Sequence, residues 1–557
     1  MAATVNVHAD VQFNLALTQE RVSAAVPERE YFVWRDRRFT YQQLTDRSRR
    51  LACFLHSRGL GVHTERDRIA GHQSGQDHVA LYMRNCNEFI ESMLGAFKSR
   101  TVPLNVNYRY VADELRYLFG DSGARAVIYH ADFAPVLAGV LDLLPADVVL
   151  VQVADDSGNG LLPGAVDFED ALAQGSPELP VTVTPDDLHI IYTGGTTGMP
   201  KAVLWRQHDI FAAAMGGQLP GAWEPVKSYD ELAQRAVDTP AMRLMLLPPL
   251  MHGAAQWGAF TQINLGGTII LPDDNTRLDA ADALRVAARE RASAIQIIGD
   301  AMARPLIEQL ESTSYDLSSL FLIGSGSVAL TVGMKQRLHE LLPDIVITDG
   351  VGSSETGPQA TYVSTKESVA TGTFGAAPGA RVANEDLTAF LVPGDDTIGW
   401  LAQTGHIPLG YLGDPDKTAR TFPVIDGVRY AVPGDRAQLL DDGSVRLLGR
   451  DSVTINSGGE KIFAEEVEAI VASHPDVVDV VVVGRRSSRW GQEVVALVQL
   501  VDGRELDDTQ LVEHAERSLA RYKVPKAWIR VPQVLRSPVG KTDYRWATSV
   551  AELEGLS

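Results

Sequence analysis

Residues 188–201 read LHIIYTGGTTGMPK, a largely apolar run that leads into a loop of glycine and threonine. The run 188–192 predicts a buried strand because its apolar residues do not alternate with polar ones. Glycine lets the loop backbone approach a ligand closely, and successive N–H groups in such a loop form a nest for an anion. Lys201 adds a point charge of the kind that binds phosphate. These features favour a polyphosphate ligand, and an ordinary Gly/Thr turn is the alternative.

The loop does not follow the P-loop pattern G-x-x-x-x-G-K-[ST]. Lys201 stands three residues after Gly198, with Pro200 between them, and Ala202 follows it. Other parts of the chain must therefore decide what the loop binds.

The same pattern, a short apolar run followed by small residues, recurs further along the chain. Short apolar runs at 243–247, 294–298, 320–323 and 344–348 each lead into a stretch of glycine, serine or proline. Such runs are typical of parallel strands buried on both faces, and a helical pattern at 278–292 lies between two of them. Alternating strands and helices predict an α/β sheet, in which ligands bind beyond the carboxyl ends of the strands. We expect the loops to line one crevice there.

Composition narrows the class of protein. The chain has 557 residues, 45% hydrophobic and 22% charged, which is typical of a globular protein with more than one domain. The sequence shows neither an apolar run long enough for a bilayer nor a secretory signal, and its two cysteines suit a reducing cytoplasm. The formal charge of −21 argues against a nucleic-acid binder. We therefore expect a cytoplasmic protein that binds anions through local features.

The last hundred or so residues differ in pattern. They predict a helix at 465–475, strands at 477–484 and 493–501, and a helix at 511–525. Such an order describes a compact α+β unit. We place the boundary after residue 451, giving a large domain 1–451 and a small domain 452–557.

Five motifs occur in a fixed order along the chain: YTGGTTGMPK (192–201), DGVGSSETG (349–357), YAVPGDRA (430–437), GRDSVTINSGGEKIFAEEVE (449–468) and PVGKTDYR (538–545). Together they resemble the core motifs of the adenylate-forming superfamily, which includes acyl-CoA synthetases, nonribosomal-peptide adenylation domains and luciferases. The resemblance spans about residues 39–545. It implies an α/β large N-terminal domain of parallel-rich sheets flanked by helices, with a distorted β-barrel subdomain, and a small mobile α+β C-terminal domain.

The resemblance also implies a site. The ATP-binding residues would be Thr193, Gly194, Gly195, Thr196, Thr197, Gly198, Lys201, Ser325, Gly326, Asp349, Gly350, Ser354, Asp435, Arg450 and Lys541. The catalytic residues would be Lys541, Glu355, Thr196 and His252, and Glu355 and Thr196 would also hold Mg²⁺. Asp435 corresponds to the carboxylate that binds the ribose hydroxyls, and His252 to a histidine near the carboxylate end of the acyl pocket.

The chain departs from the family pattern at four positions. Gly194 stands where the family usually has serine, and Ala202 where it has glycine. Val351 stands where an aromatic residue commonly stacks on adenine, and Ser452 where the hinge is more often Asp or Lys. Adenine contact at Val351 and the behaviour of the hinge are therefore left open, and Asp451 is a candidate for the hinge function.

In the family, two half-reactions share one site. The acid and Mg²⁺–ATP give an acyl-adenylate and pyrophosphate, and the thiol of coenzyme A then displaces AMP. Lys541 would contact the substrate carboxylate and the α-phosphate during the first step, where a preorganised cation stabilises developing negative charge. The small domain would then rotate about Asp451 and Ser452, bringing Gly458 and Gly459 to the coenzyme A channel. Arg521 and Lys523 are candidates for the phosphates of coenzyme A.

The residues around His252 suggest an apolar acid. Ala254, Ala255 and Trp257 are small or apolar, and Asp300 is the residue to consider for an amine-reading role. Segments 63–76 and 221–240 resemble those of actinobacterial acyl-CoA synthetases, some of which act on fatty or steroid side-chain acids. We therefore favour a fatty or bulky acid.

The favoured function is an ATP-dependent acid–CoA ligase, an AMP-forming acyl-CoA synthetase that uses ATP, Mg²⁺ and coenzyme A. The first alternative is an adenylating enzyme that loads a carrier protein, and the second is a non-catalytic nucleotide-binding relative. We expect small-molecule partners, no nucleic acid and no membrane span, and leave a homodimer open.

Overall fold

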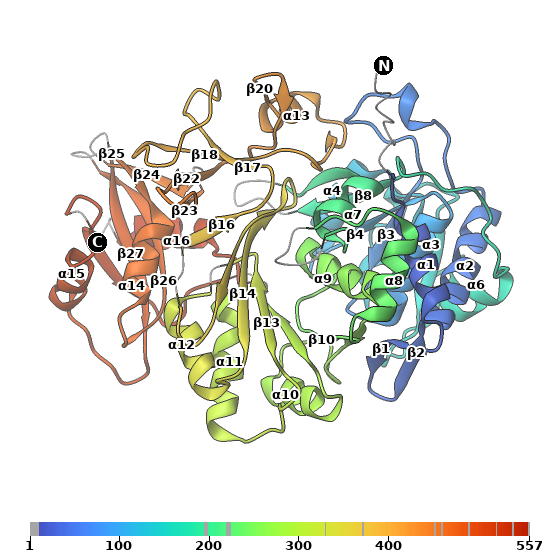
Figure 1. Ribbon diagram of the computed structural model, residues 1–557, viewed down its shortest axis with the longest axis horizontal. Helices are drawn as coiled ribbons and strands as arrows, with labels where there is room; N and C mark the ends of the chain where they lie inside the picture. Colours follow the sequence, from blue (N-terminus) through green and yellow to red (C-terminus); the bar gives the residue numbers. More distant parts are fainter. Residues whose placement is uncertain are drawn as a thin grey trace, which may run out of the picture.

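The computed structural model describes residues 11–193, 199–218, 224–328, 330–369, 372–450, 453–457, 460–487, 491–519, 521–536 and 540–554. Figure 1 shows two large sheets with helices around and between them, and a small terminal domain at one end, beside α11 and α12. The α/β class and the separate small α+β domain predicted from the sequence are confirmed.

The eight-stranded sheet contains the strand that precedes the glycine–threonine loop. Its strands lie in the order β19 (Gly410–Tyr411), β9 (Lys201–Arg206), β8 (Leu188–Thr193), β4 (Val102–Asn105), β3 (His78–Tyr82), β5 (Ala126–His130), β6 (Val149–Val153) and β7 (Val166–Asp167). From β8 to β7 the neighbouring strands are parallel, whereas β9 is antiparallel to both β8 and β19. The predicted buried strand at 188–192 is confirmed as β8.

The thirteen-stranded sheet has a parallel part and an antiparallel part. Its order is β17 (Ala380–Ala383), β18 (Ile398–Gln403), β22 (Asp435–Leu439), β23 (Val445–Arg450), β16 (Thr373–Ala376), β15 (Gly357–Ser364), β14 (Val346–Ser353), β13 (Leu322–Gly326), β12 (Ala294–Ile297), β10 (Arg243–Leu246), β11 (Thr268–Ile270), β1 (Glu30–Trp34) and β2 (Arg37–Thr40). Strands β14, β13, β12, β10, β11 and β1 pair in parallel. The strands from β15 to β17, in sheet order, are antiparallel, and the hairpin β20 (Val424–Ile425) and β21 (Val428–Arg429) packs against them.

Two expectations about these strands need correction. The four later apolar runs are β10, β12, β13 and β14 of one sheet, but β8 belongs to the other, because an apolar run reveals burial and not pairing partners. The Gly/Ser stretches at 324–326 and 349–353 are not loops either. They continue β13 and β14, and a Cβ at Gly352 would lie 2.4 Å from the carbonyl oxygen of Gly357, so the two strands approach closely only because glycine stands there.

Helices fill the space between the two sheets and cover their outer faces. They are α1 (Leu15–Ala25), α2 (Tyr41–Ser57), α3 (Asn87–Lys98), α4 (Ala112–Ser122), α5 (Ala134–Ala138), α6 (Phe168–Gln174), α7 (Gln207–Ala214), α8 (Tyr229–Asp238), α9 (Gly253–Asn264), α10 (Ala280–Arg289), α11 (Gly299–Ser312), α12 (Val332–Leu341) and α13 (Pro415–Thr421). Short 3₁₀ turns occur at Arg66–Arg68, Ala131–Phe133 and Leu141–Leu143. The helix predicted at 278–292 is confirmed as α10, which starts after Asp279 because that side chain accepts the N–H of Asp282.

One apolar core joins the two sheets. It includes Leu81 of β3 and Leu244 of β10, together with side chains of α2, α3 and α9. Every residue of α3 is buried, so this helix lies inside the large domain rather than on its surface. Among the described residues, no helix has both the length and the apolar character needed to cross a bilayer.

The described residues of the small domain form five strands and three helices. Its sheet has the order β25 (Glu460–Phe463), β24 (Thr454–Ser457), β27 (Gly491–Leu500) and β26 (Val477–Ser487), with β28 (Ala527–Arg530) paired to β27. Its helices are α14 (Ala464–Ala472), α15 (Asp508–Glu516) and α16 (Tyr544–Glu554). Separate apolar clusters cover the two faces, one formed with α14 and α15 and the other with α16. The two predicted strands and the helix predicted at 465–475 are confirmed, and the helix predicted at 511–525 exists as α15 but ends at Glu516, so its second half was wrong. Strands β24, β25 and β28 and helix α16 were not predicted.

Candidate active site

The glycine–threonine loop joins two antiparallel strands. Thr193 ends β8, Lys201 begins β9, and the two residues are paired across the hairpin. The predicted phosphate-loop residues Gly194, Gly195, Thr196, Thr197 and Gly198 lie outside the described residues. The hairpin therefore presents Thr193 and Lys201 at the base of the loop.

A tyrosine from a distant part of the chain lies beside Lys201. Strand β19 pairs with β9, and Lys201 Nζ lies 5.7 Å from the centroid of the Tyr411 ring. Lys417 Nζ of α13 lies 4.9 Å from the same centroid. The Tyr411 hydroxyl donates to Glu355 Oε1 at 2.7 Å. Two cations and one carboxylate thus meet around one aromatic ring.

Glu355 lies in the tight turn between β14 and β15, where it is buried. Its backbone N–H donates to Ser353 Oγ at 3.2 Å, and the indole N–H of Trp205 donates to the carbonyl oxygen of Ser354 at 2.9 Å. The turn is therefore attached to β9, the strand that carries Lys201. Within the described residues, the Glu355 carboxylate accepts a hydrogen bond from Tyr411 and forms no ion pair.

Asp435 and Arg450 face each other on the paired strands β22 and β23. Arg450 Nε donates to Asp435 Oδ1 at 3.1 Å. Burial raises the pKa of Asp435, and the Arg450 charge only partly opposes that effect. The predicted ribose residue and its predicted neighbour therefore form an ion pair between a buried carboxylate and a half-buried guanidinium.

The predicted adenine residues lie side by side on β13 and β14. Ser325 pairs with Asp349, and Gly326 with Gly350. The Asp349 carboxylate is bound by the buried Lys335 at 2.8 Å, and burial still raises the pKa of Asp349. The Asp349 carboxylate is therefore already paired with Lys335 in the interior of the large domain. Val351 packs instead against the apolar cluster of the antiparallel part of the sheet.

His252 stands at the N-terminus of α9. Its Nε2 atom is enclosed and has no hydrogen-bond partner among the described residues. Burial, with smaller contributions from the charges of Lys541 and Arg109, lowers the pKa of His252 to about 3. The imidazole is therefore neutral, with one ring nitrogen available to a ligand.

Asn105 fixes the position of His252, and sequence reasoning missed it. Its amide donates to the carbonyl oxygens of Tyr192 at 2.9 Å and Met251 at 2.6 Å, and its Oδ1 accepts the Tyr192 N–H at 2.8 Å. Asn105 thus connects the end of β8 to the residue before His252. No local pattern marks it, because its partners are distant in sequence.

Lys541 of the small domain reaches the large domain. Gly540 has φ +72°, and a Cβ there would lie 3.3 Å from Ala301 Cβ of α11, so the turn lies directly on this helix. Burial lowers the pKa of Lys541, Arg450 adds to the lowering, and Glu355 opposes it. Lys541 nevertheless keeps solvent-exposed surface, so the lowering of its pKa is smaller than full enclosure would cause.

A second contact docks the small domain in this position. Arg304 of α11 donates through Nη2 to the carbonyl oxygen of Val478 at 2.7 Å. The predicted hinge residues Asp451 and Ser452, and the predicted channel residues Gly458 and Gly459, lie outside the described residues. The boundary after residue 451 therefore stays a prediction.

Of the three other candidates, two have close partners within the protein. Asp300 accepts the N–H of Thr331, the residue that precedes α12, at 2.8 Å. Lys523 Nζ lies 2.7 Å from Glu466, whereas Arg521 is almost fully exposed. Asp300 and Lys523 therefore make internal contacts.

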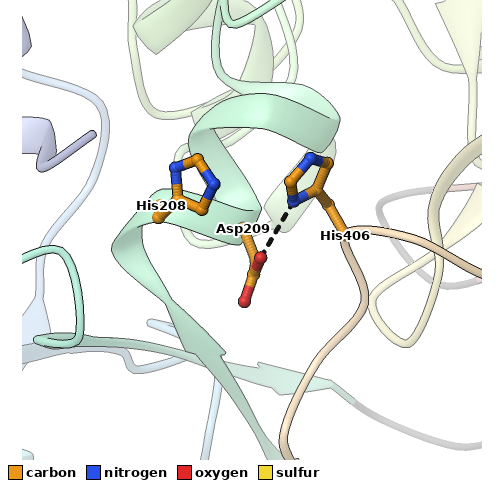
Figure 2. A group of neighbouring side chains, drawn as sticks. All are labelled: His208, Asp209 and His406. Atoms are coloured by element: carbon orange, nitrogen blue, oxygen red, sulfur yellow. Dashed lines mark hydrogen bonds and ion pairs between the residues drawn. The ribbon is translucent and has the colours of Figure 1, made fainter. Parts of the chain in front are cut away.

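Within the described part of the chain, His208, Asp209 and His406 are spaced closely enough to suggest a metal site (Figure 2). His406 Nδ1 lies 2.9 Å from Asp209 Oδ1. His208 Nδ1, however, accepts the backbone N–H of Phe13 at 3.1 Å, so in a neutral ring the proton is on Nε2, the atom nearer the other two side chains. A metal-bound histidine normally donates through its second nitrogen. The cluster therefore fits a hydrogen-bonded joint between α7 and the segment before β19 better than a metal site.

Comparison with known proteins agrees with this geometry. Residues 19–401 match the family model for AMP-binding enzymes, and residues 466–541 match that for the AMP-binding enzyme C-terminal domain. The medium-chain acyl-CoA ligase Mig of Mycobacterium avium is 57% identical over 540 residues, covering 97% of this chain and 98% of that protein. A medium/long-chain-fatty-acid–CoA/3-oxocholest-4-en-26-oate–CoA ligase of Mycobacterium tuberculosis is 40% identical, covering 97% of each chain.

Solved structures share the fold. The anthranilate CoA ligase AuaEII, in complex with anthranoyl-AMP, superposes with a TM-score of 0.81 at 20% identity, covering 98% of each chain. The chain belongs to the AMP-binding enzyme family, and it is an ATP-binding, AMP-forming acyl-CoA ligase.

Proposed function

We propose that this ligase activates a medium- or long-chain fatty acid, or a steroid side-chain acid, and transfers the acyl group to coenzyme A. The observation that carries the proposal is the position of Lys541. The charge of this lysine acts on His252, and the charges of Glu355 and Arg450 act on the lysine, so Lys541 lies near all three. A carboxylate near His252 and a phosphate near Glu355 would both lie within reach of one cation.

The large domain would bind ATP. Thr193 and Lys201 would contact the terminal phosphates with the loop between them, Asp435 would accept the ribose hydroxyls, and the β13–β14 edge would face the adenine. The Asp349 side chain is bound to Lys335, so its part in the adenine slot would fall to its backbone. We expect Asp435 to exchange part of its contact with Arg450 for the ribose.

Glu355 has the chemistry to hold Mg²⁺. The ion prefers oxygen ligands and usually adds substrate phosphates to one or two carboxylates. Glu355 offers a buried carboxylate that a tyrosine hydroxyl orients, next to two lysines. Bound there, the ion would neutralise charge on the polyphosphate. Thr196 remains the second proposed ligand.

The first half-reaction would use Lys541 and His252. The carboxylate oxygen attacks the α-phosphorus, and pyrophosphate leaves. Lys541 would hold both anions together and stabilise the charge that develops on the α-phosphoryl oxygens. His252, neutral and with an unpaired Nε2, would donate or accept one hydrogen bond at the carboxylate without adding charge.

The second half-reaction needs a path for the thiol. The sulfur of coenzyme A attacks the acyl carbonyl, the thiol proton is lost, and AMP leaves. Lys541 would leave the path of the thiol open only if the small domain turned away. That movement would break two contacts between the domains, Gly540 with α11 and Arg304 with Val478. We propose Asp451 and Ser452 as the hinge and Gly458 and Gly459 as the lining of the coenzyme A channel.

The acyl group would lie along α9. A Cβ at Gly253 would touch Ile191 and Trp257, and a Cβ at Gly258 would collide with Gln296 Oε1, so α9 is closely packed at these points. The described neighbours at these points are Ile191, Trp257 and the uncharged Gln296, a surrounding that suits a hydrocarbon chain better than a second charged group. The names of the two mycobacterial relatives agree with such an acid.

The test is a pyrophosphate-release assay with medium-chain, long-chain and steroid side-chain acids, each with and without coenzyme A. We expect pyrophosphate with the fatty or steroid acids, and AMP release that depends on coenzyme A. Pyrophosphate release with no coenzyme A-dependent AMP would favour the alternative that the enzyme loads a carrier protein. No pyrophosphate with any acid would contradict the proposal.

A further inference from the structure

Lys417 lies in the polyphosphate region although none of the five sequence motifs contains it. Its ammonium and that of Lys201 both approach the Tyr411 ring, at 4.9 and 5.7 Å from the centroid. The positive charge of Lys201 therefore acts on Lys417. Lys417 is the third residue of α13, and its backbone N–H is bound by Asp414 at 2.9 Å, so the helix start fixes its position.

Charged groups from three parts of the chain face Lys417. Lys201 faces it from β9, Glu355 from the turn between β14 and β15, and Asp414 from the start of its own helix. Glu355 accepts the Tyr411 hydroxyl, and Asp414 accepts the Lys417 backbone N–H. Burial and, after it, Lys201 lower the pKa of Lys417 to about 8, although the two carboxylates oppose this. Two ammonium groups held this close destabilise each other until an anion joins them.

We propose that Lys417 is a second cation for the terminal phosphates of ATP and for the pyrophosphate that leaves. The inference rests on the proposed function and extends it, because the sequence motifs supply only Lys201 at this end of the nucleotide. The Tyr411 ring holds the two ammonium groups on a common surface by cation–π contact without neutralising them. A diphosphate group, with several oxygens, is the anion that two such cations can share.

The location of Lys417 gives it a separate task from Lys541. Lys417 belongs to the large domain, on a helix whose preceding strand is paired to the Lys201 strand. It therefore stays at the phosphates when the small domain moves. Lys541 would act on the α-phosphate during bond formation, and Lys417 would hold the leaving group.

The experiment measures binding of magnesium pyrophosphate and Mg²⁺–ATP by calorimetry to the full chain and to Lys417→Ala and Lys417→Arg. We expect Lys417→Ala to weaken both by about ten- to a hundredfold, as for loss of one charged hydrogen bond. Lys417→Arg should keep most of the affinity. Arg420→Ala, on the same helix, is the matched control and should bind like the parent. Thermal unfolding checks that each variant is folded.

The pH dependence gives a second readout. Anion binding favours the charged ammonium, so it should raise the pKa of Lys417 and take up a proton when the free group has lost one. Pyrophosphate affinity should therefore fall as the pH rises above about 8 in the parent. Lys417→Arg keeps its charge and should show a smaller fall, and comparing the two removes the ligand's own titration.

The outcomes separate the two ideas. If folded Lys417→Ala binds pyrophosphate and ATP as the parent does, the inference is wrong, whatever the enzyme activates. Equal pH profiles for the parent and Lys417→Arg would also overturn it. If the parent releases no pyrophosphate with any acid but Lys417→Ala still loses pyrophosphate binding, the proposed function fails and the assignment of Lys417 as a phosphate ligand stands.

Discussion

The backbone N–H of Arg450 donates to Glu465 Oε2 at 3.1 Å. The bond joins the last residue of β23 to the first turn of α14, so it links the large sheet to the small domain on either side of the proposed hinge. Gly449 makes room for it, since a Cβ there would lie 2.0 Å from the same carboxylate oxygen, and its φ of +112° also suits glycine. Burial raises the pKa of Glu465 to about 7, and the charge of Asp435 adds to the shift.

Glu465 makes the stability of the protein sensitive to pH. Its ordinary pKa is 4.5, so between pH 4.5 and about 7 the folded chain holds a proton that the unfolded chain has lost. The free energy of unfolding therefore falls as the pH rises through this interval. We expect Glu465→Gln, which keeps an oxygen acceptor without the charge, to reduce the fall measured by urea denaturation at pH 5.5 and pH 8.

A second buried carboxyl, Glu468, also contributes to the pH dependence of stability. Burial raises its pKa to about 8, in the same direction, so part of the pH dependence should survive in Glu465→Gln. Glu513→Gln, on the exposed side of α15, is the matched control and should leave the profile of the parent unchanged. A Glu465→Gln profile identical to that of the parent would show that this carboxyl titrates normally.

Lys541→Ala should separate the half-reactions. We expect acyl-adenylate formation to fall by about 10²–10³, as for loss of one electrostatic donor at an oxyanion. Thioester formation from preformed acyl-adenylate and coenzyme A should stay near normal, because the lysine leaves with the small domain. Both rates are measured on the same purified variant, with Lys526→Ala as the control. An equal fall in both steps would assign Lys541 a structural part instead.

Glu355→Gln tests the proposed magnesium ligand. The side chain lies in a turn and keeps an oxygen that can accept the Tyr411 hydroxyl, so the fold should remain. Loss of the negative charge should raise the Mg²⁺ concentration needed for half-maximal pyrophosphate release. The measurement is a Mg²⁺ titration at saturating ATP and acid. An unchanged titration curve would place the ion on other residues.

Asn105→Ala tests the link between β8 and His252. The change removes three hydrogen bonds and leaves the Tyr192 N–H and two carbonyl oxygens unpaired in a buried place. Each unpaired buried group costs about 1–3 kcal/mol, so we expect a clear loss in the free energy of unfolding. In the fraction that folds, KM for the acid should rise more than KM for ATP, because His252 lies at the acid. Equal changes in both constants would argue against this link.

Much of the secondary structure followed from the sequence, because apolar runs mark buried strands and helical spacing marks α10 and α14. The motifs contain Glu355, Asp435, Arg450 and Lys541, and the structure brings Glu355 and Arg450 close enough for their charges to act on Lys541. Their proposed functions are predictions that the experiments above test. The positions of these residues could be predicted because each motif includes the turn or strand end that holds its residue.

The remaining features depend on pairing between distant segments. Tyr411 and Lys417 reach Lys201 only because β19 pairs with β9, some two hundred residues earlier, and no local signal shows that pairing. Asn105 could not be predicted for the same reason, because its hydrogen-bond partners lie on β8 and just before α9. The strands β24 and β25 are too short to show a pattern. Asp349 fitted a motif, but its buried partner Lys335 lies on another element and could not be foreseen.

Helix α3 carries a consequence for how the large domain comes apart. Each of its residues is covered, with side chains from both sheets in the same core. If one sheet unfolded, the side chains of α3 that pack against it would become exposed to solvent. Neither sheet can therefore unfold while the other keeps its apolar core buried. The large domain should therefore melt in a single cooperative step, and a nucleotide bound at the edge of one sheet should delay the loss of both.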